Sequence, residues 1–85
     1  MGNYALTAHA AAMARERCID LKWVAYVIAE PAVAYPDPRD GTLTHFLRKI
    51  PENGDRALRI VIDSAQLPPR VISLFFDRKA TREMR

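Results

Sequence analysis

The chain has 85 residues, of which 49% are hydrophobic and 27% charged, and this predicts one globular domain over residues 1–85. Its single cysteine excludes an internal disulfide, and no apolar run reaches the roughly 18 residues that a membrane helix needs. The N-terminus has no basic start followed by an apolar run, as a secretory signal would, so we expect a cytoplasmic protein with no membrane partner.

Charge is distributed unevenly along the chain. Residues 1–44 hold four basic and five acidic side chains, a balance of −1, while residues 45–85 hold nine basic and five acidic ones, a balance of +4. Arginine outnumbers lysine by ten to three, and its planar guanidinium suits phosphate oxygens. The second half is therefore either an ordinary solvated surface or a surface that faces phosphate groups.

Two helices are predicted at the start of the chain. Thr7 is a suitable N-cap for a helix over about Ala8–Arg17, and Asp20 for a second over about Leu21–Ala29. Pro31 ends the second helix, because the residue before a proline is driven out of the helical region. The short link between them predicts an αα-hairpin. The apolar stripe expected to face the core consists of Leu21, Val24, Ala25 and Ile28.

Strand signals follow Pro31. The pair Asn53-Gly54 is typical of a hairpin turn between two of these strands. We expect an ordered core over about residues 5–78 and a frayed, charged tail over residues 79–85. The predicted strands are Leu43–Ile50, Ala57–Ser64 and Arg70–Phe76, with a short fourth one around Ala32–Tyr35 left open.

The predicted fold class is α+β, with the N-terminal αα-hairpin packed on one face of a three- to four-stranded antiparallel β-meander. Alternation in the middle strand places Leu58, Ile60 and Ile62 on one face and Arg59 on the other. Such a sheet leaves its second face open to solvent or to a ligand.

Most familiar catalytic motifs are missing from the sequence. The three glycines are far apart, so there is no phosphate-binding loop, and neither a cysteine pair nor a spaced histidine pair indicates zinc. Ser64 and Ser73 lack the glycine elbow of a hydrolase nucleophile. Cys18 lies at a helix end among apolar neighbours, which favours a structural thiol over a reactive one. We therefore expect no metal and no cofactor.

Histidines and arginines remain as candidates for chemistry. His9 lies in the first turn of the first helix, where the helix dipole favours neutral imidazole, the form that acts as a general base. Each of these residues can also have a non-catalytic role: a histidine can pack or form hydrogen bonds, and an arginine can simply be solvated. The catalytic candidates are His9, His45 and Arg78, and the candidates for nucleic-acid binding are Arg17, Arg48, Arg59 and Lys79.

Several segments resemble the pattern of a bacterial family, domain-of-unknown-function family 4258. That pattern opens with H-A-x-x-R-M-x-x-R-x-I and continues with a helix that ends near an N-P or E-P pair. Ala12 precedes Met13, and an arginine is often found before the methionine in the family; Cys18 stands where glycine is usual. The resemblance covers residues 5–79 and rests on His9-Ala10, Arg17-Cys18-Ile19, Glu30-Pro31, Leu58–Ile62 and Val71–Phe76.

The family is similar in organisation to small ribonuclease toxins of the RelE and BrnT type, whose helices pack on one side of an antiparallel sheet. The resemblance implies a metal-independent endoribonuclease, the toxin of a toxin–antitoxin pair, with RNA and an antitoxin as partners. His9 or His45 would then move protons while Arg48, Arg59 and Arg78 hold phosphate. 

A second hypothesis is a non-catalytic module that binds a protein or a nucleic acid. Its exposed sheet would be the interface, with the aromatic residues Trp23, Tyr26 and Tyr35 as anchors. A homodimer is a further expectation, because the core of so short a chain is small and helix two presents Trp23 and Tyr26 at its edge.

Overall fold

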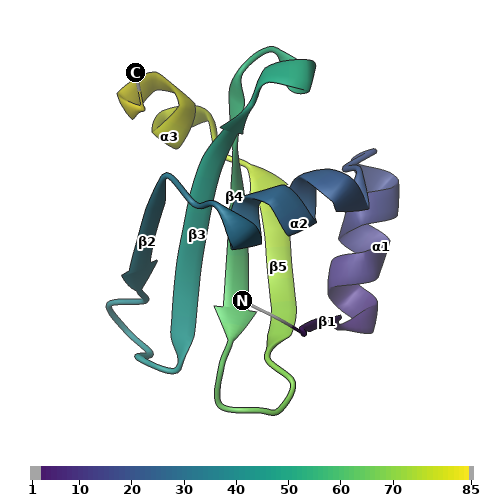
Figure 1. Cartoon of the computed structure of the whole chain (residues 1–85), viewed down its shortest axis with the longest axis vertical. Helices are drawn as coiled ribbons and strands as arrows, with labels where there is room; N and C mark the ends of the chain where they lie inside the picture. The colour runs from purple at the N-terminus through teal and green to yellow at the C-terminus, as the bar shows by residue number, and fades with distance from the viewer. Residues whose placement is uncertain (1–2, 85) are drawn as a thin grey trace.

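A computed structural model describes residues 3–84, which form helices and a five-stranded sheet (Figure 1). The α+β class is therefore confirmed. The helices are α1 (Ala8–Glu16), α2 (Leu21–Ala29) and α3 (Arg78–Glu83), and a 3-10 turn spans Pro51–Asn53. The strands are β1 (Ala5–Leu6), β2 (Val33–Pro36), β3 (Leu43–Ile50), β4 (Arg56–Asp63) and β5 (Arg70–Phe76).

The strand order in the sheet is β1-β5-β4-β3-β2. Strands β2 to β5 pair antiparallel with their neighbours, whereas β1 runs parallel to β5, with Ala5 beside Arg70 and Leu6 beside Val71. The sheet is thus mixed and has five strands rather than the three or four expected. Strand β1 was not predicted, because two residues are too few to show a period-two pattern.

One face of the sheet is covered by α1 and α2, and we call it the covered face. Figure 1 shows α2 crossing in front of the sheet and α1 lying beside β5. Both caps act as predicted, since the Thr7 hydroxyl accepts from the Ala10 N–H and the Asp20 carboxylate from the Lys22 N–H. The buried core on this face comprises Ala10, Met13, Ala14, Ile19, Val24, Val27, Ile28, Ile50, Leu58, Ile60, Ile62, Val71 and Leu74.

The stripe predicted for α2 is rotated relative to the observed one. Val24 and Ile28 are buried as expected, but Leu21 is 57% exposed and Ala25 is exposed, while Val27 is fully buried. The helix is apolar on most of its surface, so its spacing fits more than one stripe, and the crossing angle over the sheet selects the one that is buried.

The other face of the sheet carries the alternate side chains of β3 and β4, and we call it the α3 face. Here Tyr35 is aligned with His45, and Leu47 with Arg59. Helix α3 lies over one end of this face, where its residues and those of the sheet line a common groove.

Helix α3 occupies the segment that was expected to be a frayed tail. Asp77 caps it by accepting from the Ala80 N–H at 2.9 Å. The Thr81 hydroxyl ties it to β4 by accepting from the Ala57 N–H at 2.8 Å. Polar contacts such as these, rather than an apolar stripe, hold the helix, so its sequence shows no helical period of apolar residues.

The link between α1 and α2 is a Schellman motif. The N–H of Ile19 donates to the C=O of Ala14 at 2.8 Å, and the N–H of Cys18 to the C=O of Arg15 at 3.3 Å. Cys18, at the position after the C-cap, is exposed and has a φ of 54°. Glycine is favoured at this left-handed position because it has no Cβ.

Replacement of Cys18 by glycine is therefore expected to stabilise the protein. A left-handed residue with a side chain costs about 1–2 kcal/mol of folding free energy, which the substitution by glycine removes. The greater freedom of glycine in the unfolded chain offsets part of this gain. We expect a net gain of about 1 kcal/mol, which corresponds to a rise of roughly 4–8 °C in Tm. Thermal unfolding followed by circular dichroism measures it. Cys18→Ala is the matched control, because it removes the thiol but keeps Cβ, and an equal gain there would refute the backbone explanation.

Candidate functional site

A cluster of polar side chains lies on the α3 face, at the middle of the sheet. It consists of Tyr35 on β2, Asp37 in the loop after β2, His45 on β3, Arg59 on β4 and Asp77 at the N-cap of α3. We call these five residues the His45 cluster. Strand register brings Tyr35, His45 and Arg59 together, because β2 and β4 flank β3 and their side chains point to the same face. Asp37 directly follows β2, and its N–H donates to the C=O of Leu43 at 2.8 Å.

His45 is held in one tautomer by its two partners. Its Nδ1 lies 2.9 Å from Nη1 of Arg59, and its Nε2 lies 2.7 Å from Oδ2 of Asp37. A guanidinium has only donors, so Nδ1 must accept and the ring proton must reside on Nε2, which donates to Asp37. His45 is thus a neutral imidazole whose lone pair points at a cation.

Arg59 joins the two halves of the cluster. Its Nε donates to Oδ2 of Asp77 at 2.9 Å, and its Nη1 also donates to the hydroxyl of Tyr35 at 2.6 Å. The ring of Tyr35 stacks on that of His45, with centroids 5.0 Å apart and planes 5° from parallel. The side chains of His45 and Arg59 are each 15% exposed, so the network is shielded but open to solvent at its surface.

Each carboxylate divides its two oxygens between the backbone and the cluster. Asp37 Oδ1 accepts from the N–H groups of Arg39 and Asp40, while Oδ2 accepts from His45. The hydrogen bond from His45, followed by that from the Arg39 N–H, holds the pKa of Asp37 below its ordinary value. The loop that follows β2 therefore fixes the carboxylate that orients the imidazole.

The two carboxylate oxygens of Asp77, at the other end of the cluster, also bind different partners. Its Oδ1 caps α3 and its Oδ2 binds Arg59. The N–H of Ala80 is the main cause that lowers the pKa of Asp77, and the hydrogen bond from Arg59 adds to it against the opposing effect of burial. The position of α3 and the orientation of the Arg59 guanidinium are consequently coupled through one carboxylate.

A groove of about 430 Å³ lies between the sheet and α3 beside the cluster. Tyr35, Arg59 and Asp77 line it on the sheet side, and Lys79 lines it from α3. Val33 and Leu47 give it an apolar floor, and Val33 and Tyr35 are among the exposed large apolar residues of the chain. Glu83 of α3 also lines it, so the groove holds two cations, two carboxylates, an aromatic ring and apolar surface in one place.

Three of the residues singled out from the sequence meet here. His45 and Arg59 are bonded to each other, and Lys79 lines the adjoining groove. Arg78 is exposed at the first position of α3, next to Asp77.

The other three predicted residues lie elsewhere. His9 is exposed on α1, the helix that packs on the covered face and against the β5 edge. Arg48 points to the covered face, where it donates to the Tyr26 hydroxyl at 2.6 Å and to the Glu30 C=O at 2.9 Å. Arg17 donates to the C=O of Leu74 at 3.1 Å. The arginines thus do not gather on one face, because strand alternation sends Arg48 and Arg59 to opposite sides.

The aromatic residues proposed as interface anchors also separate. Trp23 and Tyr26 pack against the core, where Trp23 meets Phe76 edge-on and Tyr26 lies under the guanidinium of Arg48. Tyr35 is 37% exposed and belongs to the His45 cluster.

Two members of the cluster, Asp37 and Asp77, were not identified from the sequence as site residues. Asp37 begins a turn with Pro38, and Asp77 directly follows a strand and precedes a helix, so both have the signature of a backbone-capping aspartate. Their second role depends on strand register, which local sequence does not show. Within residues 3–84, no three His, Cys, Asp or Glu side chains form a group that could hold a metal ion. None of the described helices is long and apolar enough to cross a membrane.

Comparisons with known proteins identify a family, but no individual protein that is similar to the chain. Neither the curated proteins nor the solved structures contain a match to the chain. The profile of one family, described as Domain of unknown function (DUF4258), matches residues 6–76. This match covers the helices α1 and α2 and the sheet from Leu6 to Phe76, including all of the His45 cluster except Asp77. The chain therefore belongs to the DUF4258 family.

Proposed function

We propose that the protein binds single-stranded RNA on the α3 face and cleaves it with its own side chains, His45 acting as the base. One observation carries this proposal: the Nδ1 lone pair of His45 points at the guanidinium of Arg59 while Asp37 holds the Nε2 proton. A neutral imidazole in a fixed tautomer, next to a cation that can bind phosphate, provides the two parts that phosphodiester cleavage requires.

The reaction begins when an RNA phosphate binds Arg59. The guanidinium turns its Nη1 towards the phosphate oxygens, which frees Nδ1 of His45. The ribose 2′-OH then gives its proton to Nδ1, and the 2′ oxygen forms a bond to phosphorus. The bond from phosphorus to the 5′ oxygen breaks, and this oxygen takes up a proton from water. The products are a 2′,3′-cyclic phosphate and a 5′-hydroxyl, and His45 returns its proton to solvent.

The cations Arg59 and Lys79 support this assignment. Arg59 remains a cation. Its guanidinium, together with Lys79 in the adjoining groove, would stabilise the negative charge that develops on the phosphorane oxygens. Asp37 stays ionised because its pKa is lowered, so it stabilises the imidazolium that forms on His45. The proposal also rests on the resemblance in organisation to RelE- and BrnT-type toxins given by the sequence. An antitoxin that covers the α3 face is the partner this proposal implies.

A second candidate function is RNA or protein binding without catalysis. Both ring nitrogens of His45 have partners within the chain, as they would in a network that only stabilises the sheet. The apolar groove with exposed Val33 and Tyr35 would then be the binding surface.

Incubation of the purified protein with 5′-labelled single-stranded RNA in EDTA tests the proposal. We expect fragments that end in 2′,3′-cyclic phosphate, and we expect a 2′-deoxy substitution at the cleaved position to block cleavage there, because the attacking oxygen is removed. RNA that stays intact but binds to the protein would favour the second function. RNA that neither binds nor is cleaved would refute both RNA functions.

A further inference from the structure

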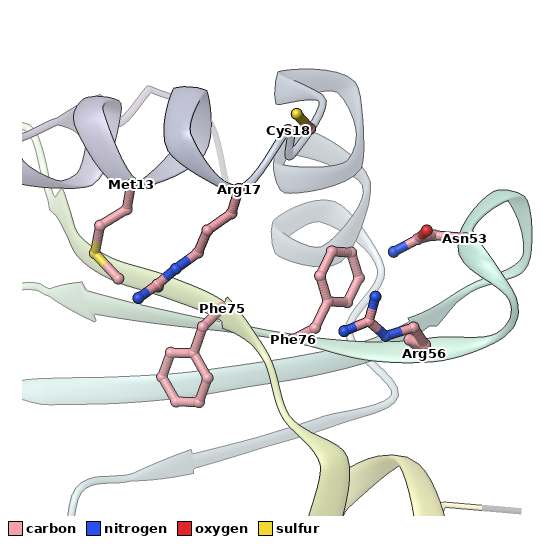
Figure 2. A pocket seen from close by; sticks show the side chains of 7 residues that line it. All are labelled: Met13, Arg17, Cys18, Asn53, Arg56, Phe75 and Phe76. Atoms are coloured by element: carbon pink, nitrogen blue, oxygen red, sulfur yellow. The ribbon is translucent and has the colours of Figure 1, made fainter.

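A second hollow lies at the outer edge of the sheet, apart from the His45 cluster. It has a volume of about 560 Å³ and is enclosed by the end of α1, the β3–β4 connection and the end of β5. Figure 2 shows Arg17 reaching down to β5 on one side and Asn53 and Arg56 on the other, with Phe76 between them. None of the residues that line this hollow is an aspartate or a glutamate.

Its two arginines are positioned by neutral groups. Arg17 donates through Nη1 to the C=O of Leu74 at 3.1 Å, on the outer edge of β5. The guanidinium of Arg56 lies 4.7 Å over the ring of Phe76, which Trp23 meets edge-on at 6.1 Å. Within residues 3–84 neither arginine forms an ion pair. Two cations with no carboxylate on either of them create a positive hollow that suits an anion.

Strand β5 separates the hollow from the His45 cluster. Phe75 and Phe76 point to opposite sides of the strand, so Phe76 lies between the arginines while Phe75 lies towards the α3 face (Figure 2). On that face the strand register aligns Phe75 with Arg59. Strands are spaced at roughly 4.8 Å, so β5 lies about 10 Å from β3, where His45 is located. One RNA strand can reach both places within a few nucleotides.

We propose that this hollow is a second subsite for single-stranded RNA, resting on the proposed function. It takes one nucleotide away from the scissile bond, with the phosphate beside Arg17 and Arg56 and the base at the edge of β5, where Phe75 also lines the hollow. Phosphate contacts give most of the affinity for single strands, and stacking on an aromatic side chain adds to it without requiring a particular base. The subsite therefore predicts binding that depends on RNA length and not on RNA sequence.

Fluorescence anisotropy with an uncleavable probe, 2′-O-methyl hexauridylate labelled with fluorescein, tests this subsite. We expect Arg17→Gln/Arg56→Gln to weaken binding of the hexamer about tenfold and to reduce the salt dependence of log Kd by about 0.7, the value for one phosphate that is no longer neutralised. The corresponding labelled dimer, which is too short to span both places, should bind wild type and variant equally. Arg15→Gln/Arg70→Gln is the matched control, since it removes the same charge from two exposed positions outside the hollow.

If the first variant does not fold, Asn53→Ala/Arg56→Gln replaces it. This second variant keeps the hydrogen bond from Arg17 to β5. Hexamer affinity that is unchanged in both variants, or that falls equally in the control, would overturn the subsite. So would a wild type that does not bind the hexamer. The readout needs no cleavage, so a protein that binds through this hollow but leaves RNA intact would refute only the catalytic proposal. A protein that cleaves RNA normally without the two arginines would refute only the subsite.

Discussion

Replacement of His45 by glutamine is expected to slow RNA cleavage by about 10²–10⁴-fold, the usual contribution of a general base. Glutamine keeps a donor and an acceptor, so Asp37 and Arg59 retain polar neighbours and the sheet should fold normally. It cannot take up the 2′-OH proton at neutral pH. RNA affinity should change little, because the proposed phosphate contacts come from arginine and lysine side chains.

His9→Gln is the matched control for this prediction. It is the same substitution at the other histidine of the chain, which is exposed on α1. Single-turnover cleavage of labelled RNA by the wild type and both variants decides between the two histidines named from the sequence. Full activity in the His45 variant, or a comparable loss in the His9 variant, would contradict the assignment of His45.

The local elements were predictable because local chemistry fixes them. α2, β3 and β5 begin and end at the predicted residues. Asp20 and Pro31 bracket α2, and the alternation in β4 correctly separated Ile60 from Arg59. Segments whose structure depends on a partner far away in the sequence were not predicted. β1 exists only by pairing with β5, and α3 only by the bonds of Asp77 and Thr81.

The candidate site was predictable in its residue types but not in its assembly. Histidine and arginine, the residue types named from the sequence, both occur in the cluster, yet the sequence offered no reason to prefer Arg59 to Arg48 or His45 to His9. The bonds that define the cluster join residues far apart, with Arg59 bound to Tyr35 across 24 positions and to Asp77 across 18. Such contacts follow from strand register, which is set by the whole sheet.

Arg59→Lys is expected to reduce cleavage by about 10²–10³-fold, even though the charge is retained. The guanidinium binds Asp77, Tyr35 and His45 at the same time, and its planar fork can hold a phosphate through two parallel hydrogen bonds. A lysine ammonium is a point charge on a flexible stem. It can replace one of these contacts but cannot set the tautomer of His45 and bind phosphate in a fixed orientation.

Arg48→Lys is the control that separates catalysis from stability. It is the same substitution on the neighbouring strand, but Arg48 points to the covered face and binds Tyr26 and Glu30. Both variants should lose some thermal stability, because each breaks hydrogen bonds to partly buried groups. Only the Arg59 variant should lose cleavage. If the two variants lose cleavage in proportion to their loss of Tm, Arg59 acts on the fold alone, and the cation next to His45 has no part in the reaction.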